Sequence, residues 1–157
     1  FTISGIVNVS GSIQLKGNKF ILNTPRANTW YDGHTEWSYL KANKEVNVST
    51  PTTQQVQNLN PYTYINAYRS AFLARLNGKQ GSDYNILLIP RSSRYGVKNV
   101  QLLISRNYQP RKIIVTQNNG KRQIITVRSF ASGQKYSDSM FKFDKRKYPK
   151  ADIIDLR

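Results

Sequence analysis

A chain of 157 residues has the length of one domain, and its 38% of apolar residues, with ten tyrosines, six phenylalanines and two tryptophans, can form a hydrophobic core. The absence of cysteine excludes disulfides, thiolate metal sites and a cysteine nucleophile. Lys and Arg outnumber Asp and Glu by 24 to 8, a net charge of +16, which favours an anionic partner. We therefore expect a single domain over residues 1–157.

The N-terminal third of the chain predicts an antiparallel meander. It opens on the strand-like FTISG, without an initiator methionine, so we expect part of the N-terminal region to lie outside the sequence shown. Short alternating segments separated by Gly, Asn and Pro follow, which is typical of strands. They are SGSIQLKG, NKFILNTP, NTWYDG, HTEWSYL and KEVNVS. Because apolar residues recur at every second position, each strand has one apolar side, and something must cover it.

Two helices are predicted after these strands. Thr50-Pro51 and Asn60-Pro61 each place a capping side chain before a proline at the first helical position. In the second helix apolar residues recur at steps of three and four. They are Tyr62, Ile65, Tyr68, Phe72 and Leu76. We expect this stripe to lie over the open face of the sheet.

The strand pattern resumes after residue 83. The predicted segments are YNILLIP, NVQLLISRN, RKIIVTQNNGKRQIITVRSF and MFKFD, and the third contains a hairpin around Asn118-Asn119-Gly120. The consecutive apolar pairs Ile113-Ile114 and Ile124-Ile125 indicate that both faces of these strands are partly covered. No apolar run approaches the roughly 20 residues of a membrane-spanning helix, so we expect no transmembrane segment.

The stretch WYDGHTEW carries candidate ligands at every second position, namely Asp32, His34 and Glu36. Asp32-Gly33 is a two-residue turn signal, and a turn there pairs Tyr31 with His34. That register places His34 and Glu36 on one face with Tyr31, and leaves Asp32 in the bend, so the acids do not converge with the histidine. The opposite face carries Trp30, Thr35, Trp37 and Tyr39. With a single histidine and no cysteine, we expect no metal, no cofactor and no catalytic residue here.

The positive charge is concentrated in the second half of the chain. Residues 1–78 carry 7 basic and 3 acidic side chains, whereas residues 79–157 carry 17 and 5. Three interpretations stay open. The charge is a solvated face, a docking surface for an acidic protein or an anionic membrane, or a nucleic-acid surface. For nucleic acid, no glycine-flanked aromatic motif of the RNA-recognition type is present.

The order of these parts resembles the LolA-type periplasmic lipoprotein carriers. Members of that family have a K-x-P/G-N-x-F turn, a D-G-x-x-x-W hairpin, a Val-rich strand and helices that begin near a T/N-P step. The corresponding segments are Lys16 to Phe20, Asp32 to Trp37, Glu45 to Val48 and Thr50 to Phe72. The ending FKFDKRKYPKADIIDLR resembles the C-terminus of one branch of these carriers. Gly17 stands where better-known carriers have an arginine implicated in lid closure.

The resemblance implies an unclosed, strongly curved antiparallel β-barrel whose apolar cavity is capped by a helical lid. It implies a monomeric, non-enzymatic carrier in the periplasm. Such a carrier binds the acyl chains of lipoproteins, accepts them from an inner-membrane exporter and delivers them to an outer-membrane acceptor. The family begins with a helix ahead of its first strand, so we expect such a helix to precede residue 1.

The candidate acyl-binding residues are the apolar strand residues and the apolar residues of the two helices, since bulky and partly polar rings suit an amphiphile. From the strands they are Ile13, Leu15, Phe20, Leu22, Trp30, Trp37, Tyr39, Val46 and Val48, expected to line one concave sheet. From the helices they are Val56, Leu59, Tyr62, Ile65, Tyr68 and Phe72, expected to close it.

Three alternatives stay open beside the carrier. Two share its fold: the outer-membrane lipoprotein acceptor, and an envelope-stress sensor that detects mislocalised lipoproteins. The third belongs to another class and is a basic domain that binds nucleic acid or another polyanion through the +16 charge.

Overall fold

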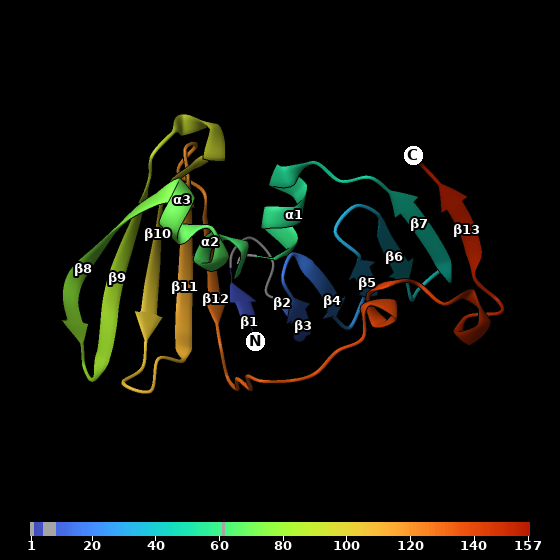
Figure 1. The fold of residues 1–157 in the computed structure, drawn as a ribbon. Coiled ribbons are helices and arrows are strands. Elements are labelled where there is room, and N and C mark those ends of the chain that lie inside the picture. The colour runs from blue at the N-terminus through green and yellow to red at the C-terminus, as the bar shows by residue number, and fades with distance from the viewer. Residues whose placement is uncertain (1, 5–8, 61) are drawn as a thin grey trace. The chain divides into compact units, whose positions relative to one another are not determined.

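The structure is a computed structural model that describes residues 2–4, 9–60 and 62–157. Phe1 and Gly5 of the predicted FTISG strand, and Pro61 of the second predicted helix start, lie outside the described residues. The described strands form two open sheets, one of seven strands and one of six, accompanied by short helices (Figure 1). The prediction of a mainly β chain with a few helices and curved, unclosed sheets is confirmed. The chain divides into two compact units, residues 1–9 with 60–132 and residues 10–59 with 133–157.

The seven-stranded sheet belongs to the first unit and has the order β2-β1-β12-β11-β10-β9-β8. Its strands are β1 (Thr2–Ser4), β2 (Val9–Ser10), β8 (Phe72–Gln80), β9 (Asp83–Pro90), β10 (Val97–Ile104), β11 (Pro110–Gln117) and β12 (Arg122–Thr126). The predicted hairpin at residues 118–120 is confirmed, because Gly120 N–H donates to the Gln117 carbonyl and Val115 pairs with Gln123. A short 3-10 helix, η1 (Ser93–Tyr95), joins β9 to β10.

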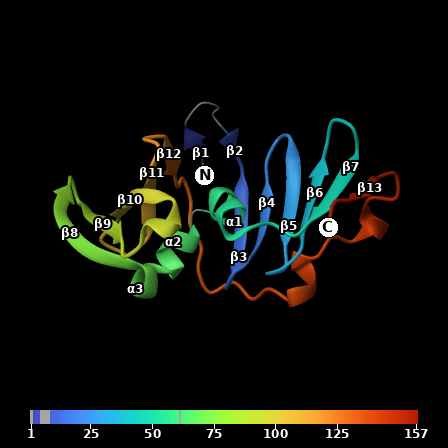
Figure 2. The same ribbon diagram turned by 90° about the horizontal axis from the view of Figure 1, so that it is seen from above.

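The six-stranded sheet belongs to the second unit and has the order β13-β7-β6-β5-β4-β3 (Figure 2). Its strands are β3 (Ser12–Lys16), β4 (Lys19–Asn23), β5 (Ala27–Tyr31), β6 (Glu36–Leu40), β7 (Glu45–Ser49) and β13 (Asp152–Asp155). The first five form the predicted antiparallel meander. The last strand was not predicted as part of the sheet, and it pairs in parallel with β7, so the sheet is not purely antiparallel.

Three short helices follow β7, namely α1 (Thr53–Leu59), α2 (Tyr62–Asn66) and α3 (Tyr68–Ala71). The first predicted cap is wrong by two residues. Thr52, not Thr50, caps α1, since its hydroxyl accepts from Gln55 N–H at 3.3 Å and the Gln55 side chain accepts from Thr52 N–H at 2.8 Å. Asn60 caps α2 as predicted, because its side-chain oxygen accepts from Tyr62 N–H at 3.2 Å.

The prediction that the second helix continues to Leu76 is wrong, because the chain enters strand β8 at Phe72. A spacing of four residues is one helical turn, but it is also two strand periods, so Phe72 and Leu76 share a face in either structure. The strand prevails because Phe72 to Leu76 pair with Pro90 to Ile86 of β9.

The predicted strand MFKFD is also wrong. Met140 and Phe141 of this stretch belong to the short 3-10 helix η2 (Asp138–Phe141), and η3 (Lys145–Lys147) follows. The alternation of Phe141 and Phe143 mimics a strand. In fact Phe141 is fully buried, and Phe143 packs on Trp30 of the six-stranded sheet, so this segment lies against a sheet instead of joining it.

Candidate functional site

The nine predicted strand residues do not line one surface. In the six-stranded sheet, Leu22 pairs with Thr29 and Phe20 with Tyr31, whereas Trp30 pairs with Ile21 and Trp37. Since paired residues share a face and neighbours alternate, the nine divide into two groups. Ile13, Leu15, Phe20 and Leu22 lie on one face, and Trp30, Trp37, Tyr39, Val46 and Val48 lie on the other. The expectation of a single lining surface is therefore wrong, because the strand register places these residues on opposite faces, and both faces of β4 are buried.

The face that carries Trp30 and Trp37, which we call the tryptophan face, is covered by the chain's own C-terminal segment, residues 136–151. Tyr148 makes ring contacts with Trp30 at 5.6 Å, Tyr39 at 4.7 Å and Phe143 at 5.3 Å between ring centroids. Val46, Val48 and Ala151 are buried in the same cluster, and Trp37 packs against it. These rings form a core within this unit, so the candidate ligand residues on this face contact protein.

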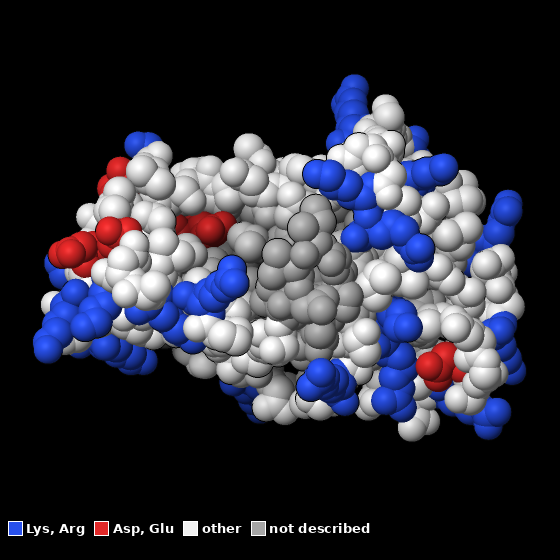
Figure 3. Space-filling view, turned by 180° about the vertical axis from the view of Figure 1, so that it is seen from behind, with Lys and Arg blue, Asp and Glu red and all other residues white. Residues whose placement is uncertain are grey.

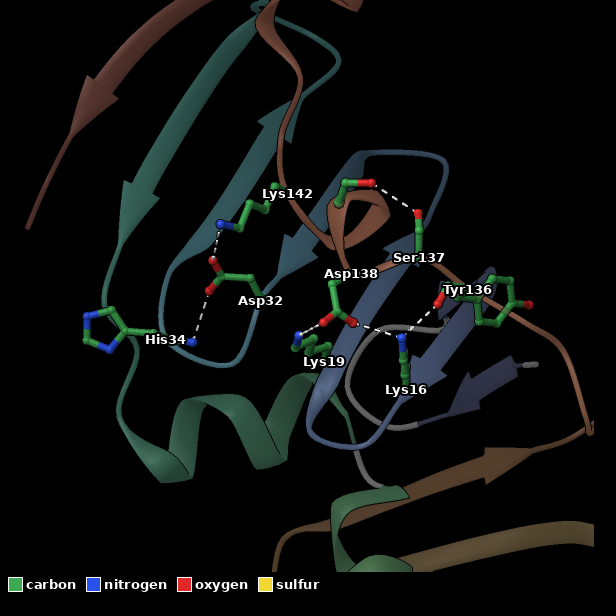
Figure 4. Close-up of polar contacts among 9 residues, drawn as sticks. Lys16, Lys19, Asp32, His34, Tyr136, Ser137, Asp138 and Lys142 are labelled. Atoms are coloured by element: carbon green, nitrogen blue, oxygen red, sulfur yellow. Dashed lines mark hydrogen bonds and ion pairs between the residues drawn. The ribbon is translucent and has the colours of Figure 1, made fainter.

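Ion pairs hold the C-terminal segment on the six-stranded sheet (Figure 4). The carboxylate of Asp138 lies between the ammonium groups of Lys16, at 2.8 Å, and Lys19, at 3.1 Å. The Lys16 ammonium also donates to the Tyr136 carbonyl at 2.8 Å. Hydrogen bonds from the two lysines lower the pKa of Asp138. All of these groups reach solvent, so the pairs position the segment and add little stability.

The hairpin that contains His34 has a longer loop than the sequence predicted. Asp32 N–H donates to the Thr35 carbonyl, and Trp30 pairs with Trp37 instead of Thr35. The shift is two residues, one full strand period, so the predicted faces are retained. The Asp32 carboxylate accepts the backbone N–H groups of His34 at 3.1 Å and Thr35 at 2.9 Å, and the imidazole points away from it (Figure 4).

Glu36 lies opposite Tyr31 at the base of this hairpin. Burial raises the pKa of the Glu36 carboxyl above its usual 4.5. Burial, followed by the charges of Asp32 and Glu36, raises the pKa of Tyr31. Ionised Glu36 is thus disfavoured by the folded chain, and the stability that its protonated form contributes is lost as the pH rises through its folded pKa.

Replacing Glu36 with glutamine is therefore expected to stabilise the chain at neutral pH. Urea unfolding at pH 7 should have a higher midpoint for Glu36→Gln than for the unchanged chain. The difference should vanish below about pH 4, where the carboxyl is protonated in both states. An equal difference at both pH values would show that the gain comes from something other than ionisation.

The predicted helix residues divide between the two units. Val56, which is buried, and Leu59 lie on α1 in the second unit. Tyr62 and Ile65 of α2 pack instead on the core of the seven-stranded sheet, and Phe72 is buried in that core. The two tyrosines among the predicted helix residues have different surroundings. Burial raises the pKa of the Tyr62 phenol. Tyr68 is 37% exposed, and its hydroxyl accepts a hydrogen bond from Arg69.

One face of the seven-stranded sheet is a continuous apolar surface, which we call the helix-covered face. In it Leu88 pairs with Val100, and Leu102 pairs with Ile86 and Ile113. The buried sheet residues of this face are Phe72, Leu88, Val97, Val100, Leu102, Ile113, Val115 and Ile125. From the helices, Tyr62, Tyr64, Ile65, Ala67 and Ala71 pack on it. Apart from Phe72, the sheet residues were absent from the predicted site, although the consecutive apolar pairs in β11 and β12 were a signal for them.

The rim of the helix-covered face is open at the β8–β9 side. Leu76 of β8 pairs with Ile86 of β9, yet Leu76 is 64% exposed. Ile86 and Ile104 are only partly buried. The covering helices α2 and α3 have five and four residues, so few hydrogen bonds hold each together. The apolar surface therefore extends beyond its cover.

One buried polar atom near this face lacks a partner in the described structure. Asn60, at the start of α2, is fully buried, and its side-chain amide nitrogen makes no hydrogen bond. Its side-chain oxygen and its carbonyl both accept bonds from the first turn of α2. A buried amide that makes no hydrogen bond is energetically costly.

No metal centre is found where the chain is described. Residues 2–4, 9–60 and 62–157 contain no group of three or more His, Cys, Asp or Glu side chains placed to hold an ion. Among the same residues, no helix is long and apolar enough to cross a membrane.

The two open sheets and the short helices define a mainly β protein with extended apolar sheet faces. The family model described as outer membrane lipoprotein carrier protein LolA matches residues 1–121. The chain therefore belongs to the LolA family of outer-membrane lipoprotein carriers, as its sequence resemblance indicated. The family's description is that of carriers, which is consistent with a chain that is not an enzyme.

Three solved structures are similar to this chain at low sequence identity, and the first of them shares its fold. An uncharacterized conserved protein from Thermus thermophilus is 12% identical, with a TM-score of 0.58 over 98% of this chain and 87% of that one. A putative outer membrane lipoprotein-sorting protein domain from Vibrio parahaemolyticus is 16% identical, with a TM-score of 0.43 over 87% and 69% of the two chains. A chain of the Pseudomonas aeruginosa MucA/MucB complex is 12% identical, with a TM-score of 0.37 over 91% and 53%. No curated protein sequence matches this chain significantly.

Proposed function

We propose that this chain is a periplasmic carrier that binds the acyl chains of lipoproteins and delivers them from the inner to the outer membrane. The family match over residues 1–121 is the observation that supports this role. In this proposal an inner-membrane exporter supplies the lipoprotein and an outer-membrane acceptor receives it. In this proposal no reaction is catalysed, and the affinity comes from burial of acyl methylenes, at about 0.8 kcal/mol each.

The acyl chains in this proposal lie on the helix-covered face. Two features favour the helix-covered face, and not the tryptophan face, as the location of the acyl chains. Leu76 leaves the rim of the helix-covered face exposed, whereas Phe143 and Tyr148 cover the tryptophan face. The short helices α2 and α3 can be displaced without breaking any strand pairing, since they contribute no strand to the sheet.

The polar end of the cargo has a candidate partner in Asn60. An acyl chain joined through an ester or amide has a carbonyl oxygen, which accepts the kind of hydrogen bond that the buried Asn60 amide lacks. A largely apolar site with a few placed polar groups is the usual composition of a lipid-binding pocket.

Native mass spectrometry of the purified chain tests the proposal directly. We expect a diacyl or triacyl species at one per chain under gentle conditions, released on denaturation and identified after extraction. A chain purified without ligand should take up a fluorescent fatty acyl probe. A ligand-free mass combined with no probe uptake would contradict the carrier role.

A further inference from the structure

The two units differ sharply in charge. The unit that contains the seven-stranded sheet, residues 1–9 and 60–132, holds 12 of the 24 Lys and Arg residues but only one of the eight acidic residues, Asp83. Every ion pair found among the described residues lies in the other unit. Figure 3 shows blue side chains gathered over the seven-stranded sheet, at the right of the view, with one small red group. The cations of this unit are therefore available to an external anion.

Three segments of this unit meet at one end of the seven-stranded sheet, which we call the hairpin end (Figure 1). The β8–β9 and β10–β11 turns both lie there, because Tyr84 at the start of β9 pairs with Ile104 at the end of β10. The chain beyond β12 joins them, since Val127 N–H donates to the Arg111 carbonyl at 2.8 Å. The hairpin end consists of Lys79, Asp83, Tyr84, Arg106, Tyr108, Arg111, Arg128 and Phe130, so the one acidic residue of this unit lies there among four cations.

The hairpin end alternates cations with exposed rings. Lys79, Arg106, Arg111 and Arg128 are exposed, and the Lys79 ammonium lies 5.4 Å from the centre of the Tyr84 ring. Tyr108, at the tip of the β10–β11 hairpin, is 82% exposed, and Phe130 is 41% exposed. Aromatic side chains among Lys and Arg suit the headgroup region of a membrane, where the ring enters the interface and the cation meets an anionic lipid.

The tip itself is held in an unfavourable backbone conformation. Tyr108 has φ +57, a region that bulky residues rarely occupy. The turn is fixed by three hydrogen bonds. Tyr108 N–H donates to the Ser105 carbonyl and Ser105 N–H to the Gln109 carbonyl, both at 2.9 Å, while the Ser105 hydroxyl accepts from Gln109 N–H at 3.2 Å. Such a position favours glycine or asparagine, so an exposed tyrosine there indicates a use for the ring.

We propose that the hairpin end of the seven-stranded sheet docks on an anionic phospholipid bilayer, with Tyr108 and Phe130 entering the interface and the surrounding arginines and lysine contacting headgroup phosphates. An acidic protein surface would be complemented by the cations, but it would not require exposed rings at the tip. The inference goes beyond acyl-chain binding and does not depend on it, because the exposed cations and rings of the hairpin end are present whether or not the helix-covered face holds an acyl chain.

The test is co-sedimentation of the full chain with phospholipid vesicles. We expect binding to vesicles with about one third phosphatidylglycerol, weak binding to pure phosphatidylcholine, and a steep fall of affinity with salt. The double variant R106E/R111E should lower the partition coefficient at least roughly tenfold. The matched control K121E/R122E changes the net charge equally at exposed positions of the β11–β12 turn, at the other end of the sheet, and should retain binding within roughly threefold.

A second variant examines the aromatic tip without a change of charge. Y108A should weaken binding to the anionic vesicles, and Y108W should give a blue-shifted emission on vesicle addition beyond that of the two native tryptophans. Equal losses from the two charge-reversed variants would overturn the assignment to the hairpin end. Failure to bind vesicles, with binding to polyglutamate instead, would replace the membrane by an acidic protein as the partner.

Discussion

Replacement of Ile86 by glutamate is expected to abolish binding of a fluorescent acyl probe while the chain remains folded. Ile86 lies on the helix-covered face between Leu102, which is buried, and Leu76, which is exposed at the rim. A carboxylate there can reach water in the free chain. It would be forced into contact with an acyl chain in the complex, and the loss of affinity should be at least roughly tenfold.

Leu87→Glu is the matched control for this prediction. Leu87 is the next residue of the same strand and pairs with Gln101 and Arg75, so it lies on the opposite face of the sheet. We expect Leu87→Glu to bind the probe as the unchanged chain does. In the same binding assay, Trp37→Glu examines the tryptophan face. Loss of binding in Leu87→Glu but not in Ile86→Glu would rule out the helix-covered face, and circular dichroism would establish that each variant is folded.

Replacement of Tyr148 by alanine is expected to lower the free energy of unfolding by about 2–4 kcal/mol. The ring contacts Trp30, Tyr39 and Phe143, and its hydroxyl lies 3.4 Å from the Asn28 side-chain nitrogen. Its loss opens a gap over the tryptophan face that the neighbouring rings cannot fill without moving.

The two tryptophans of the chain report on this change directly, because both lie on that face. Tyr148→Ala should shift the tryptophan emission to the red under native conditions, as water reaches Trp30. Tyr108→Ala is the control, since a side chain that is 82% exposed should change stability by no more than about 0.5 kcal/mol. Unchanged emission and stability in Tyr148→Ala would mean that the C-terminal segment does not cover the face.

The C-terminal segment also explains why the candidate site could not be placed from the sequence. Residues 136–151 lie beyond the 121 residues that the family model matches. They nevertheless supply Phe141, which is fully buried, and the rings that cover Trp30. The same aromatic strand residues can line a ligand cavity or fill a core. Only the presence of a covering segment distinguishes these cases.

Local sequence patterns were enough to predict most of the strands and the family of this protein. Period-two apolar residues and turn signals placed nine of the strands, from β3 to β7 and from β9 to β12, and the resemblance to the LolA family was confirmed. The faces of the Trp30–Trp37 hairpin were also predicted correctly, although its loop is longer, because a shift by two residues preserves the strand period.

Tertiary structure decided what each apolar surface contacts. The spacing of Phe72 and Leu76 fits a helix and a strand equally, and pairing with β9 selected the strand. Strand alternation identifies an apolar face, but it does not identify the element that covers it, because that element is distant in sequence. Hence only the folded chain separated the nine strand residues into two faces and placed α2 on the seven-stranded sheet. It also brought the cations of three segments, distant in sequence, to one end of that sheet.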